Sequence, residues 1–388
     1  MIPKIFEQID HADLAGLIAN RVAERASLEF KRDLPGNAER ARKEFLADIS
    51  SFANAQGGDI IYGVEEHQGV AARLVGIESD NHDAVILRLE DQILAGIEPR
   101  ISGLKLQWVK GPQHALLIRI PASAAAPHRV IYAGNGKFYG RKSNGKYEMD
   151  THELRQAFTA TEALTTKLRA LHFEAVDAAT QDGLPISLGD DPRAIISVIP
   201  VNIFRDRRHF DITPENAVAP IKPDRHIDSI HMLEGILLYA APGIAGAVRS
   251  YAITHRAGRT DVVWTFGRVV NELKREEMRI VWPKRFEDGL FDAVLSTTAR
   301  LQPLGVEGPW VVFTTLLGIK DYVLTLNEQY FSEPAWRDRV TFPELVSDTL
   351  NSETLLPVLR SFWLSFGVPR PAKPFPDENK MTATIQSR

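Results

Sequence analysis

Residues 43–66, KEFLADISSFANAQGGDIIYGVEE, join a helical pattern to a strand pattern through a pair of glycines. Phe45, Ile49 and Phe52 recur at helical spacing, which predicts an amphipathic helix over residues 38–55. The run DIIYGV after the glycines is short and apolar, as expected of a buried strand. A helix, a tight turn and a strand in direct succession indicate a domain that mixes α and β structure.

Patterns on both sides of this stretch extend the mixture of helices and strands. Asp10 is a suitable N-cap for a first helix, and Asp150 with Glu153 supplies a capping box for a closing helix. The strand at 59–64 is expected to pair with residues 70–77 in a hairpin. Further elements are predicted on either side: a helix at 80–96 and strands at 28–31, 103–110, 114–120, 129–133 and 136–141.

The second half of the chain has a similar mixed character, so the predicted fold class is α+β. An N-terminal mixed α/β domain is expected at residues 1–158 and a second α+β domain at 160–375. Residues 376–388 have no apolar pattern and are expected to form a loose tail. The second domain is predicted to contain strands at 195–204, 235–240, 251–255, 261–268 and 310–316, and helices at 286–301 and 343–364.

The composition excludes several classes of protein. The 388 residues are 44% hydrophobic and 25% charged, which is enough apolar material for a folded core. The 46 lysines and arginines against 50 aspartates and glutamates give a net charge of −4, so any nucleic-acid-binding surface must be local. The absence of cysteine excludes disulfides, cysteine-ligated metals and thiol nucleophiles, and it fits a cytoplasmic protein.

No targeting segment and no membrane partner are expected from the sequence. Residues 1–10 carry charged side chains where a signal peptide needs an apolar run. The longest uncharged stretch, residues 235–248, contains Pro242 and is shorter than the roughly 18–20 residues of a membrane-spanning helix.

Two acids and a lysine gather around the first predicted strand. Glu29 and Lys31 share one face of the strand at 28–31, because successive side chains alternate, and Glu24 ends the preceding helix. Two carboxylates can hold a divalent ion while an ammonium group stabilises charge on a phosphate, which suits phosphodiester cleavage. The alternative is that Glu29 and Lys31 form an ordinary solvated ion pair.

Residues 57–66 contain a second candidate site. The paired glycines allow a positive φ and a close backbone approach, which a phosphate or a carboxylate could use. The alternative is a helix C-cap followed by a tight turn. Glu65 and Glu66 follow the strand, and one of them could add a third carboxylate to Glu24 and Glu29.

Residues 128–147 form a basic segment that contains no acid, within an acidic chain. Its cations could neutralise phosphates, and its aromatic rings could stack on unpaired bases. The alternative is a solvated hairpin whose aromatic side chains pack into the core. The candidate nucleic-acid-binding residues are Arg129, Lys137, Tyr139, Arg141, Lys142 and Lys146.

Three stretches together resemble the AlbA-2 domain of Schlafen-like proteins: LEFKRDLP at 28–35, residues 43–66, and GKFYGRKSNGKYEMD at 136–150. The resemblance covers roughly residues 20–158. It implies a mixed α/β domain that binds nucleic acid. In nuclease-active Schlafen relatives, it also implies a metal-assisted triad of carboxylates that cuts structured RNA such as tRNA.

The family's E-x4-E-x-K pattern falls on Glu24, Glu29 and Lys31 with the same spacing. The third acid of the family, usually an aspartate, falls on Glu65, with Glu66 as the alternative. The resemblance therefore implies that Glu24, Glu29 and Glu65 hold the metal, and that these three residues and Lys31 are catalytic.

The first functional hypothesis is a metal-dependent endoribonuclease that acts on tRNA or other structured RNA. Mg²⁺ or Mn²⁺ is the expected cofactor, because hard cations prefer carboxylate oxygens. The alternatives are a non-catalytic DNA-binding transcriptional regulator and an ATP-binding protein that uses the turn at Gly57 and Gly58. RNA is the favoured partner and DNA the other one. The second domain would select the target, sense a signal or mediate assembly. A homo-oligomer is one form that such assembly could take.

Overall fold

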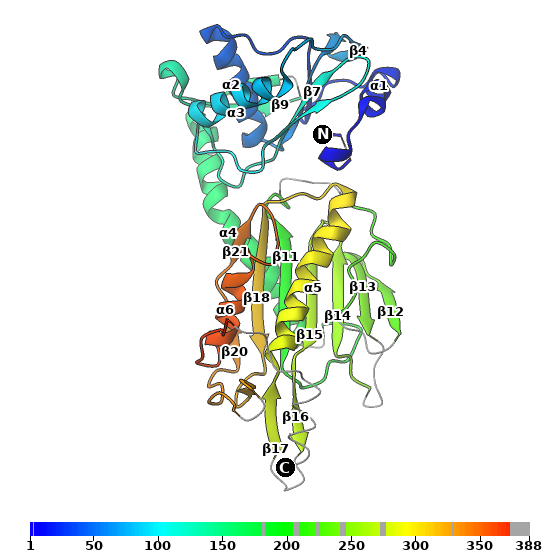
Figure 1. Ribbon diagram of the computed structural model, residues 1–388, viewed down its shortest axis with the longest axis vertical. Coiled ribbons are helices and arrows are strands. Elements are labelled where there is room, and N and C mark those ends of the chain that lie inside the picture. The colour runs from blue at the N-terminus through cyan, green and yellow to red at the C-terminus, as the bar shows by residue number, and fades with distance from the viewer. Residues whose placement is uncertain are drawn as a thin grey trace. The chain divides into compact units, whose positions relative to one another are not determined.

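The computed structural model describes residues 1–2, 4–143, 145–180, 183–204, 209–221, 226–240, 246–271, 277–327 and 330–372. The chain divides into two compact units, of which the first is formed mainly by Met1–Thr166 and the second begins at Lys167. Each unit combines helices with sheets (Figure 1), so the predicted α+β class is confirmed. The tail predicted at 376–388 lies outside the described residues.

The first unit is built on a four-stranded sheet in the order β1-β2-β7-β6. Strands β1 and β2 are parallel, and the other neighbours are antiparallel. Its strands are β1 (Leu28–Lys31), β2 (Gly58–Tyr62), β7 (Ala115–Ile120) and β6 (Lys105–Val109). The two predicted strands at 28–31 and 114–120 therefore lie in one sheet with the strand that follows the paired glycines.

Both faces of this sheet are covered, because alternate side chains of its strands are apolar. Ile60 points into a cluster with Phe52 of helix α2 (Glu39–Asn54). Ile61 points the opposite way, into a cluster with Leu14 of helix α1 (His11–Ala19). Asp10 caps α1 as predicted, since its side chain accepts hydrogen bonds from the backbone N–H groups of Ala12 and Asp13.

A second four-stranded sheet has the order β10-β9-β8-β5. Helix α2 packs against both this sheet and β7 of the first one, and helix α3 (His82–Gly96) packs against α2. The strands of the second sheet are β10 (Gly145–Glu148), β9 (Lys137–Lys142), β8 (Arg129–Val130) and β5 (Ile97–Glu98). The sequence pattern predicted β8 and β9 but not β10.

The predicted hairpin is wrong in one of its strands. The backbone of Gly63 adopts a φ of +95°, which breaks the predicted strand at 59–64 into two elements. The part before Gly63 joins the first sheet as β2. The part after it, β3 (Val64–His67), pairs with β4 (Val70–Leu74) in a separate two-stranded sheet. The hairpin turn at residues 68–69 comes directly before β4, in agreement with the predicted second strand at 70–77.

The second unit contains an eight-stranded sheet in the order β12-β13-β14-β15-β11-β18-β20, with β21 also paired to β18. Val176 of helix α4 (Thr151–Thr180) packs with Ile195 and Leu237 on one face of this sheet. On the opposite face, Trp264 stacks on Phe286 of helix α5 (Pro283–Leu301). The strands are β12 (Ile227–His231), β13 (Gly235–Ala240), β14 (Ser250–His255), β15 (Thr260–Thr265), β11 (Arg193–Pro200), β18 (Trp310–Leu317), β20 (Arg339–Thr341) and β21 (Leu345–Ser347).

Two predictions in the second unit are corrected. The predicted helix at 343–364 begins only with α6 (Leu356–Leu364), because residues 345–347 form β21 and pair with β18. The predicted strand at 261–268 is two strands, since the chain leaves the large sheet after β15. It then enters a three-stranded sheet of β16 (Gly267–Asn271), β17 (Glu277–Val281) and β19 (Val323–Leu324).

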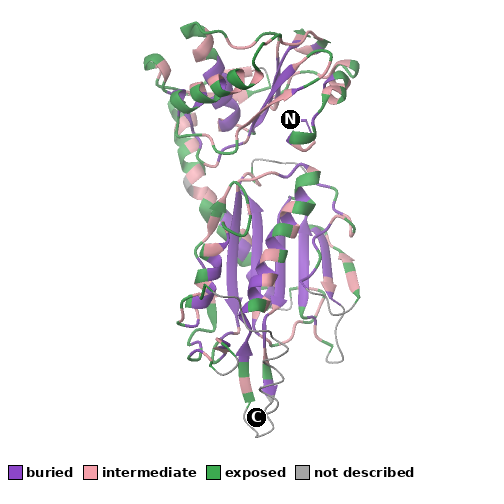
Figure 2. Cartoon of the chain, viewed as in Figure 1, coloured by how far each residue is buried: buried purple, intermediate pink, exposed green. Residues whose placement is uncertain are grey.

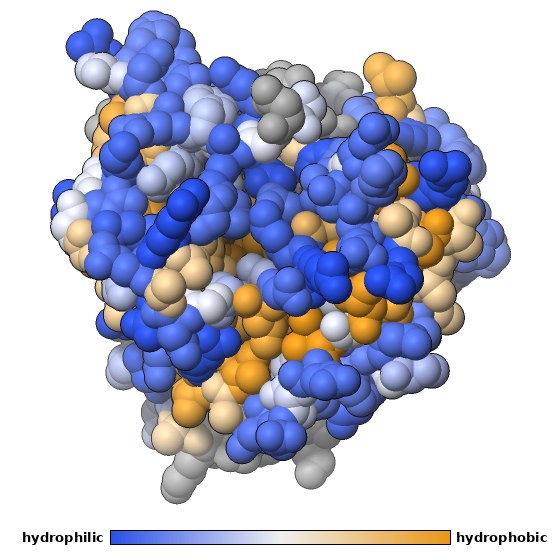
Figure 3. Space-filling model, turned by 90° about the horizontal axis from the view of Figure 1, so that it is seen from above, coloured by the Kyte–Doolittle hydropathy of each residue, from blue (hydrophilic) through white to orange (hydrophobic). Residues whose placement is uncertain are grey.

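Burial follows this architecture. Figure 2 shows that the sheet strands are mostly buried, whereas the helices expose one side. Hydrophilic side chains cover most of the face shown in Figure 3, and the largest group of hydrophobic ones lies below the centre of the view. No helix within the described ranges is long and apolar enough to cross a membrane.

Candidate functional site

Glu29 is the centre of a buried charge cluster in the first unit. It lies on β1 with Lys31 on the same face, as predicted, and its carboxylate pairs with the ammonium of Lys31. The other carboxylate oxygen lies 2.5 Å from Nη2 of Arg141 on β9. Burial alone would raise the pKa of Glu29, but Arg141 and Lys31 outweigh it and hold the pKa below its ordinary value. The Glu29 side chain is only 10% exposed, so the alternative of a solvated surface pair is wrong.

Glu24 lies beside this cluster and is half-buried. Its Oε1 accepts a hydrogen bond of 2.8 Å from the backbone N–H of Phe30, which fixes the carboxylate at the edge of β1. Burial raises the pKa of Glu24, and the negative charges of Glu29 and Glu66 raise it further. Its Oε2 has no hydrogen-bond partner among the described residues.

Glu65, the predicted third acid, is engaged elsewhere. It lies on β3 and pairs with Arg32 at 3.1 Å and with Arg73 at 2.9 Å. The adjacent Glu66 accepts a hydrogen bond from the backbone N–H of Gly69 in the hairpin turn, and its charge acts on Glu24. Of the two glutamates that follow β2, the alternative Glu66 is therefore the one coupled to the first predicted acid.

Asp48 is an acid of the cluster that the sequence analysis missed. It is 2% exposed on α2, with Oδ1 2.5 Å from Nζ of Lys146 and Oδ2 3.8 Å from Nζ of Lys31. Burial raises its pKa, and the nearby charge of Glu29 adds to the effect. A signal for it existed, because Asp48 lies three residues after Phe45 and four before Phe52, on the apolar face of the helix.

These groups open into one cavity of about 600 Å³, which we call the charged cavity. Helix α2, strands β1, β9 and β10, and the turn between β3 and β4 contribute residues to its wall. The charged side chains that line it are Glu24, Arg25, Glu29, Glu44, Asp48, Arg141 and Lys146. Glu65 does not line it.

Arg141 has one unused donor in the wall of the charged cavity. Its side chain is 4% exposed, and its guanidinium carbon lies 3.8 Å from the centre of the Phe52 ring. Nε donates a hydrogen bond of 3.1 Å to the backbone oxygen of Ala26, and Nη2 pairs with Glu29. Nη1 is buried and has no partner among the described residues. A buried donor without an acceptor is unfavourable, so this atom is suited to an incoming anion.

The other cations of the basic segment are paired with acids from outside it. Lys146 pairs with Glu44 as well as with Asp48, so two acids of α2 neutralise it. The remaining pairs are Arg129 with Glu98 at 2.8 Å, Lys137 with Glu148 at 2.6 Å and Lys142 with Glu153 at 3.7 Å. The segment is basic in sequence, but in the folded domain its charge is balanced locally.

The aromatic residues of this segment are held by the protein. The Tyr139 ring packs against the core around α2, and its hydroxyl accepts a hydrogen bond of 3.3 Å from the side chain of Asn135. Phe138 contacts Phe158 edge to face. The hydroxyl of Tyr147 donates a hydrogen bond of 3.0 Å to Glu153. These contacts match the alternative in which the aromatic rings of the hairpin pack inward.

The two glycines between α2 and β2 serve close packing. Gly57 has a φ of +68°, and a Cβ there would lie 2.6 Å from backbone atoms of Ile120 and Ala122. A Cβ on Gly58 would lie 2.5 Å from the Phe52 ring and 2.6 Å from the backbone oxygen of Ser27. Protein atoms fill the space that the glycines leave, so the turn gives no support to an ATP site.

The acids do not form a metal site as they are placed. Within the ranges that the structure describes, no three His, Asp or Glu side chains gather closely enough to hold a metal ion. Both oxygens of Glu29 contact cations, and Glu65 contacts two arginines. The oxygen donors suit Mg²⁺ or Mn²⁺ chemically, but the present arrangement does not fit a site of three carboxylates. The predicted metal site stays a prediction.

A comparison with protein families identifies the first unit. The model of the Schlafen, AlbA_2 family matches residues 24–150. These residues therefore form a Schlafen AlbA_2 domain, as the sequence motifs indicated. The matched segment contains β1, α2 and β9, the elements that build the charged cavity.

Two solved structures resemble part of the chain. The DIP2311 protein from Corynebacterium diphtheriae has 22% identity over 39% of this chain and 28% of its own, with a TM-score of 0.28. The N-terminal domain of a RecG-related protein from Nitrosomonas europaea has 21% identity over 37% of this chain and 97% of its own, also with a TM-score of 0.28. No curated protein matches the chain.

Proposed function

Because residues 24–150 are a Schlafen AlbA_2 domain, we propose that this domain binds nucleic acid, with RNA favoured over DNA, and that a backbone phosphate enters the charged cavity. The observation that supports this most directly is the buried, unpartnered Nη1 of Arg141. A phosphate oxygen would accept its hydrogen bond, and guanidinium groups bind phosphate strongly. Arg25 in the same wall adds positive charge.

The substitution Arg141→Lys tests this proposal. Lysine keeps the charge that Glu29 needs, but it lacks the second terminal nitrogen of arginine, the atom that has no partner. Loss of one charge-assisted hydrogen bond is worth about 1.5 kcal/mol, so RNA affinity should fall about tenfold. Fluorescence anisotropy with labelled tRNA, single-stranded RNA and duplex DNA measures the effect and ranks the three nucleic acids.

Arg129→Lys is the matched control. Arg129 belongs to the same basic segment and also pairs with an acid, but it does not line the charged cavity. Its substitution should leave the affinity within about twofold, as expected of an exposed ion pair. Equal losses in the two variants would place the phosphate outside the cavity, and an unchanged affinity in Arg141→Lys would rule out a contact with Nη1.

Metal-dependent cleavage of the bound RNA is the second candidate function. It is favoured by Glu24 and Glu29, which line the same cavity as Arg141, and by the open Oε2 of Glu24. An added Mg²⁺ or Mn²⁺ ion would have to compete with Arg141 and Lys31 for Glu29. We therefore expect any activity to need millimolar metal.

Incubation of the protein with labelled tRNA and Mg²⁺, Mn²⁺ or EDTA tests this second candidate. A nuclease should cut with a metal, stop with EDTA, and lose most turnover in Glu24→Gln while RNA binding persists. Binding without cleavage at any metal concentration would leave the domain as a nucleic-acid-binding module. In that case the DNA-binding regulator becomes the better hypothesis.

A further inference from the structure

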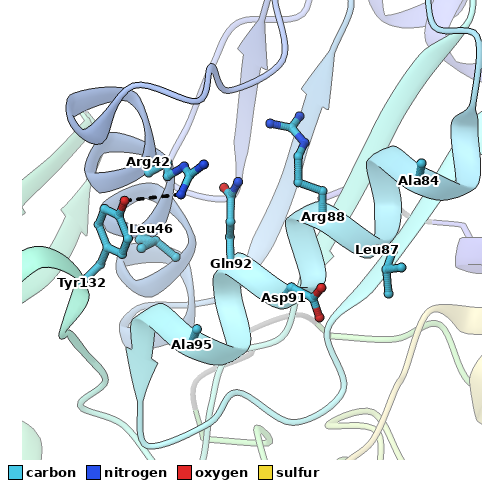
Figure 4. Close-up of a pocket in the computed structure, with 9 residues that line it drawn as sticks. All are labelled: Arg42, Leu46, Ala84, Leu87, Arg88, Asp91, Gln92, Ala95 and Tyr132. Atoms are coloured by element: carbon cyan, nitrogen blue, oxygen red, sulfur yellow. Dashed lines mark hydrogen bonds between the residues drawn. The ribbon is translucent and has the colours of Figure 1, made fainter.

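A second pocket lies in the first unit, between helices α2 and α3 and next to the turn after β8. Its volume is about 490 Å³, within the usual range of small-molecule sites. Figure 4 shows Arg42 and Leu46 of α2, Gln92 and Arg88 of α3, and Tyr132 around it. It shares no lining residue with the charged cavity, and of its lining residues only Tyr132 belongs to the basic segment.

Two residues that line this pocket each have a buried polar atom without a partner in the part of the chain that the structure describes. One of these atoms is Nε of Arg42, a hydrogen-bond donor, and the other is Oε1 of Gln92, an acceptor. The Arg42 side chain is held in place by a hydrogen bond of 3.4 Å from Nη1 to the hydroxyl of Tyr132 (Figure 4). Buried polar atoms normally have hydrogen-bond partners. One unsatisfied donor and one unsatisfied acceptor on residues of the same pocket therefore point to a ligand that carries both an acceptor and a donor.

The rest of the pocket is apolar and includes an aromatic residue. Leu46, Ala84, Leu87 and Ala95 supply aliphatic contacts, and Tyr132 packs half-buried at one end. Such walls favour a flat ring over a flexible or strongly charged group. A nucleobase combines a flat ring with a donor and an acceptor on one edge, and proteins recognise unpaired bases by this combination of stacking and edge contacts.

The cations beside the pocket suit the phosphate that accompanies a base. Arg88 and Gln92 are four residues apart and extend to the same side of α3 in Figure 4. Arg88 Nη1 donates to the backbone oxygen of Pro35 at 3.2 Å and to Oδ1 of Asn37 at 3.0 Å. These bonds hold the guanidinium of Arg88 in position near the pocket.

We propose that this pocket, here called the base pocket, binds one nucleobase. Gln92 and Arg42 contact the edge of the base and Tyr132 contacts its ring. The proposal rests on the proposed function in that the base would belong to a strand bound by the same domain. A free mononucleotide offers the same chemistry, so the test below includes both sources.

The main test compares two single strands of equal length with the full-length protein, one of RNA and one in which every base is absent. Wild type should bind the RNA strand at least fivefold more tightly, since only that strand can fill the base pocket. Gln92→Met keeps the side-chain size but removes both amide hydrogen-bonding groups. It should lower the affinity for RNA about fivefold and leave the affinity for the abasic strand unchanged.

Two further variants make the comparison specific. Tyr132→Leu should also weaken RNA binding and spare abasic binding, because it removes the aromatic contact. Gln113→Met makes the same chemical change as Gln92→Met at an exposed position outside both cavities and should alter neither affinity. Thermal unfolding checks that each variant is folded. If Gln92→Met does not fold, Tyr132→Leu replaces it in the comparison of the two strands.

The outcomes separate the base pocket from the proposed function. Equal affinity for both strands in wild type, unchanged by Gln92→Met, would overturn the base pocket and leave phosphate binding intact. If wild type binds neither strand and also fails to bind tRNA and duplex DNA, the proposed function fails, and titration with AMP, GMP, CMP and UMP then decides the base pocket. Binding of a mononucleotide that Gln92→Met weakens would support it, and binding of none would overturn it.

Discussion

At the scale of single residues, Glu29 shows how strongly a buried acid depends on its partners. Its carboxylate is held between Lys31 and Arg141 in a nearly inaccessible position. Removal of one member of a buried ion pair leaves the other charge uncompensated, which typically costs 3–5 kcal/mol. Arg141 would be left in that state by a neutral side chain at position 29.

We predict that Glu29→Gln lowers the free energy of unfolding by about 3 kcal/mol at pH 7. The effect should shrink with acid. The pKa of Glu29 is lower in the folded state, so its contribution is present above its ordinary pKa of about 4.5 and is lost as the pH falls through the lowered value. Urea unfolding of both proteins between pH 7 and pH 3 measures the difference.

Glu65→Gln is the control for this change, because Glu65 pairs with two exposed arginines. Surface ion pairs contribute at most about 1 kcal/mol, so Glu65→Gln should be nearly neutral at every pH. A Glu29→Gln protein as stable as wild type would contradict the structural role of Glu29. It would then make a purely functional role for this acid more plausible.

At the scale of elements, the sequence predicts those that follow from a local pattern, but not those that depend on pairing with distant strands. Strand β1 has the predicted bounds, because the alternation of LEFK is a property of those four residues alone. The break at Gly63 depends on pairing with distant β7 and β4, which no local pattern contains. Residues 345–347 are a strand only because β18 offers an edge to pair with.

The candidate site was predictable to a similar extent. Glu24, Glu29 and Lys31 lie close in sequence, and the structure brings them together. Asp48 and Arg141 join them only when α2 and β9 pack on β1, so the acid that neutralises each cation could not be identified from the sequence. Glu65 follows β2 in sequence, but the turn at Gly63 places it on the separate hairpin.

The turn between α2 and β2 gives a prediction at this scale. Gly57→Ala should destabilise the protein by at least about 2 kcal/mol, because alanine adds both a strained positive φ and a clash with backbone atoms. Gly134→Ala separates the two effects, since Gly134 has a similar φ of +73° but open space around its Cβ position. Its cost should be about 1 kcal/mol. Equal costs measured by thermal unfolding would mean that the clash is relieved without penalty.

At the scale of the whole molecule, the second unit has a polar network inside its core. Ser197 donates a hydrogen bond of 2.6 Å to Asp261, so Nδ1 of His172, 2.8 Å away, must be the donor to Ser197. Nε2 of His172 then accepts from the hydroxyl of Thr315 at 2.8 Å. These four residues are far apart in sequence, so no sequence motif predicts the network.

This network predicts how the stability of the chain depends on pH. Burial lowers the pKa of His172 to about 4, whereas an unfolded histidine has a pKa of about 6.5. Between these values the unfolded state binds a proton that the folded state excludes, so the stability contribution is complete above pH 6.5 and is lost as the pH falls toward 4. The loss should reach about 3 kcal/mol.

His172→Gln provides the measurement, since glutamine can hydrogen-bond but does not titrate. The difference in unfolding free energy between wild type and His172→Gln should shrink by about 3 kcal/mol from pH 7 to pH 4. His226→Gln at an exposed position is the control and should follow the wild-type curve. Parallel curves of unfolding free energy against pH for wild type and His172→Gln would show that His172 does not cause the pH dependence between pH 7 and pH 4.

The paired cations of the basic segment have a consequence for how fast a nucleic acid is captured. A patch of free cations attracts a strand over long distances and can raise association rates to about 10⁸–10⁹ M⁻¹s⁻¹ at low salt. Here each of the five cations has an acid beside it, so their fields largely cancel a few ångströms from the surface. For the proposed binding of nucleic acid we therefore expect association by random collision, at about 10⁵–10⁶ M⁻¹s⁻¹, and discrimination between nucleic acids through their dissociation rates.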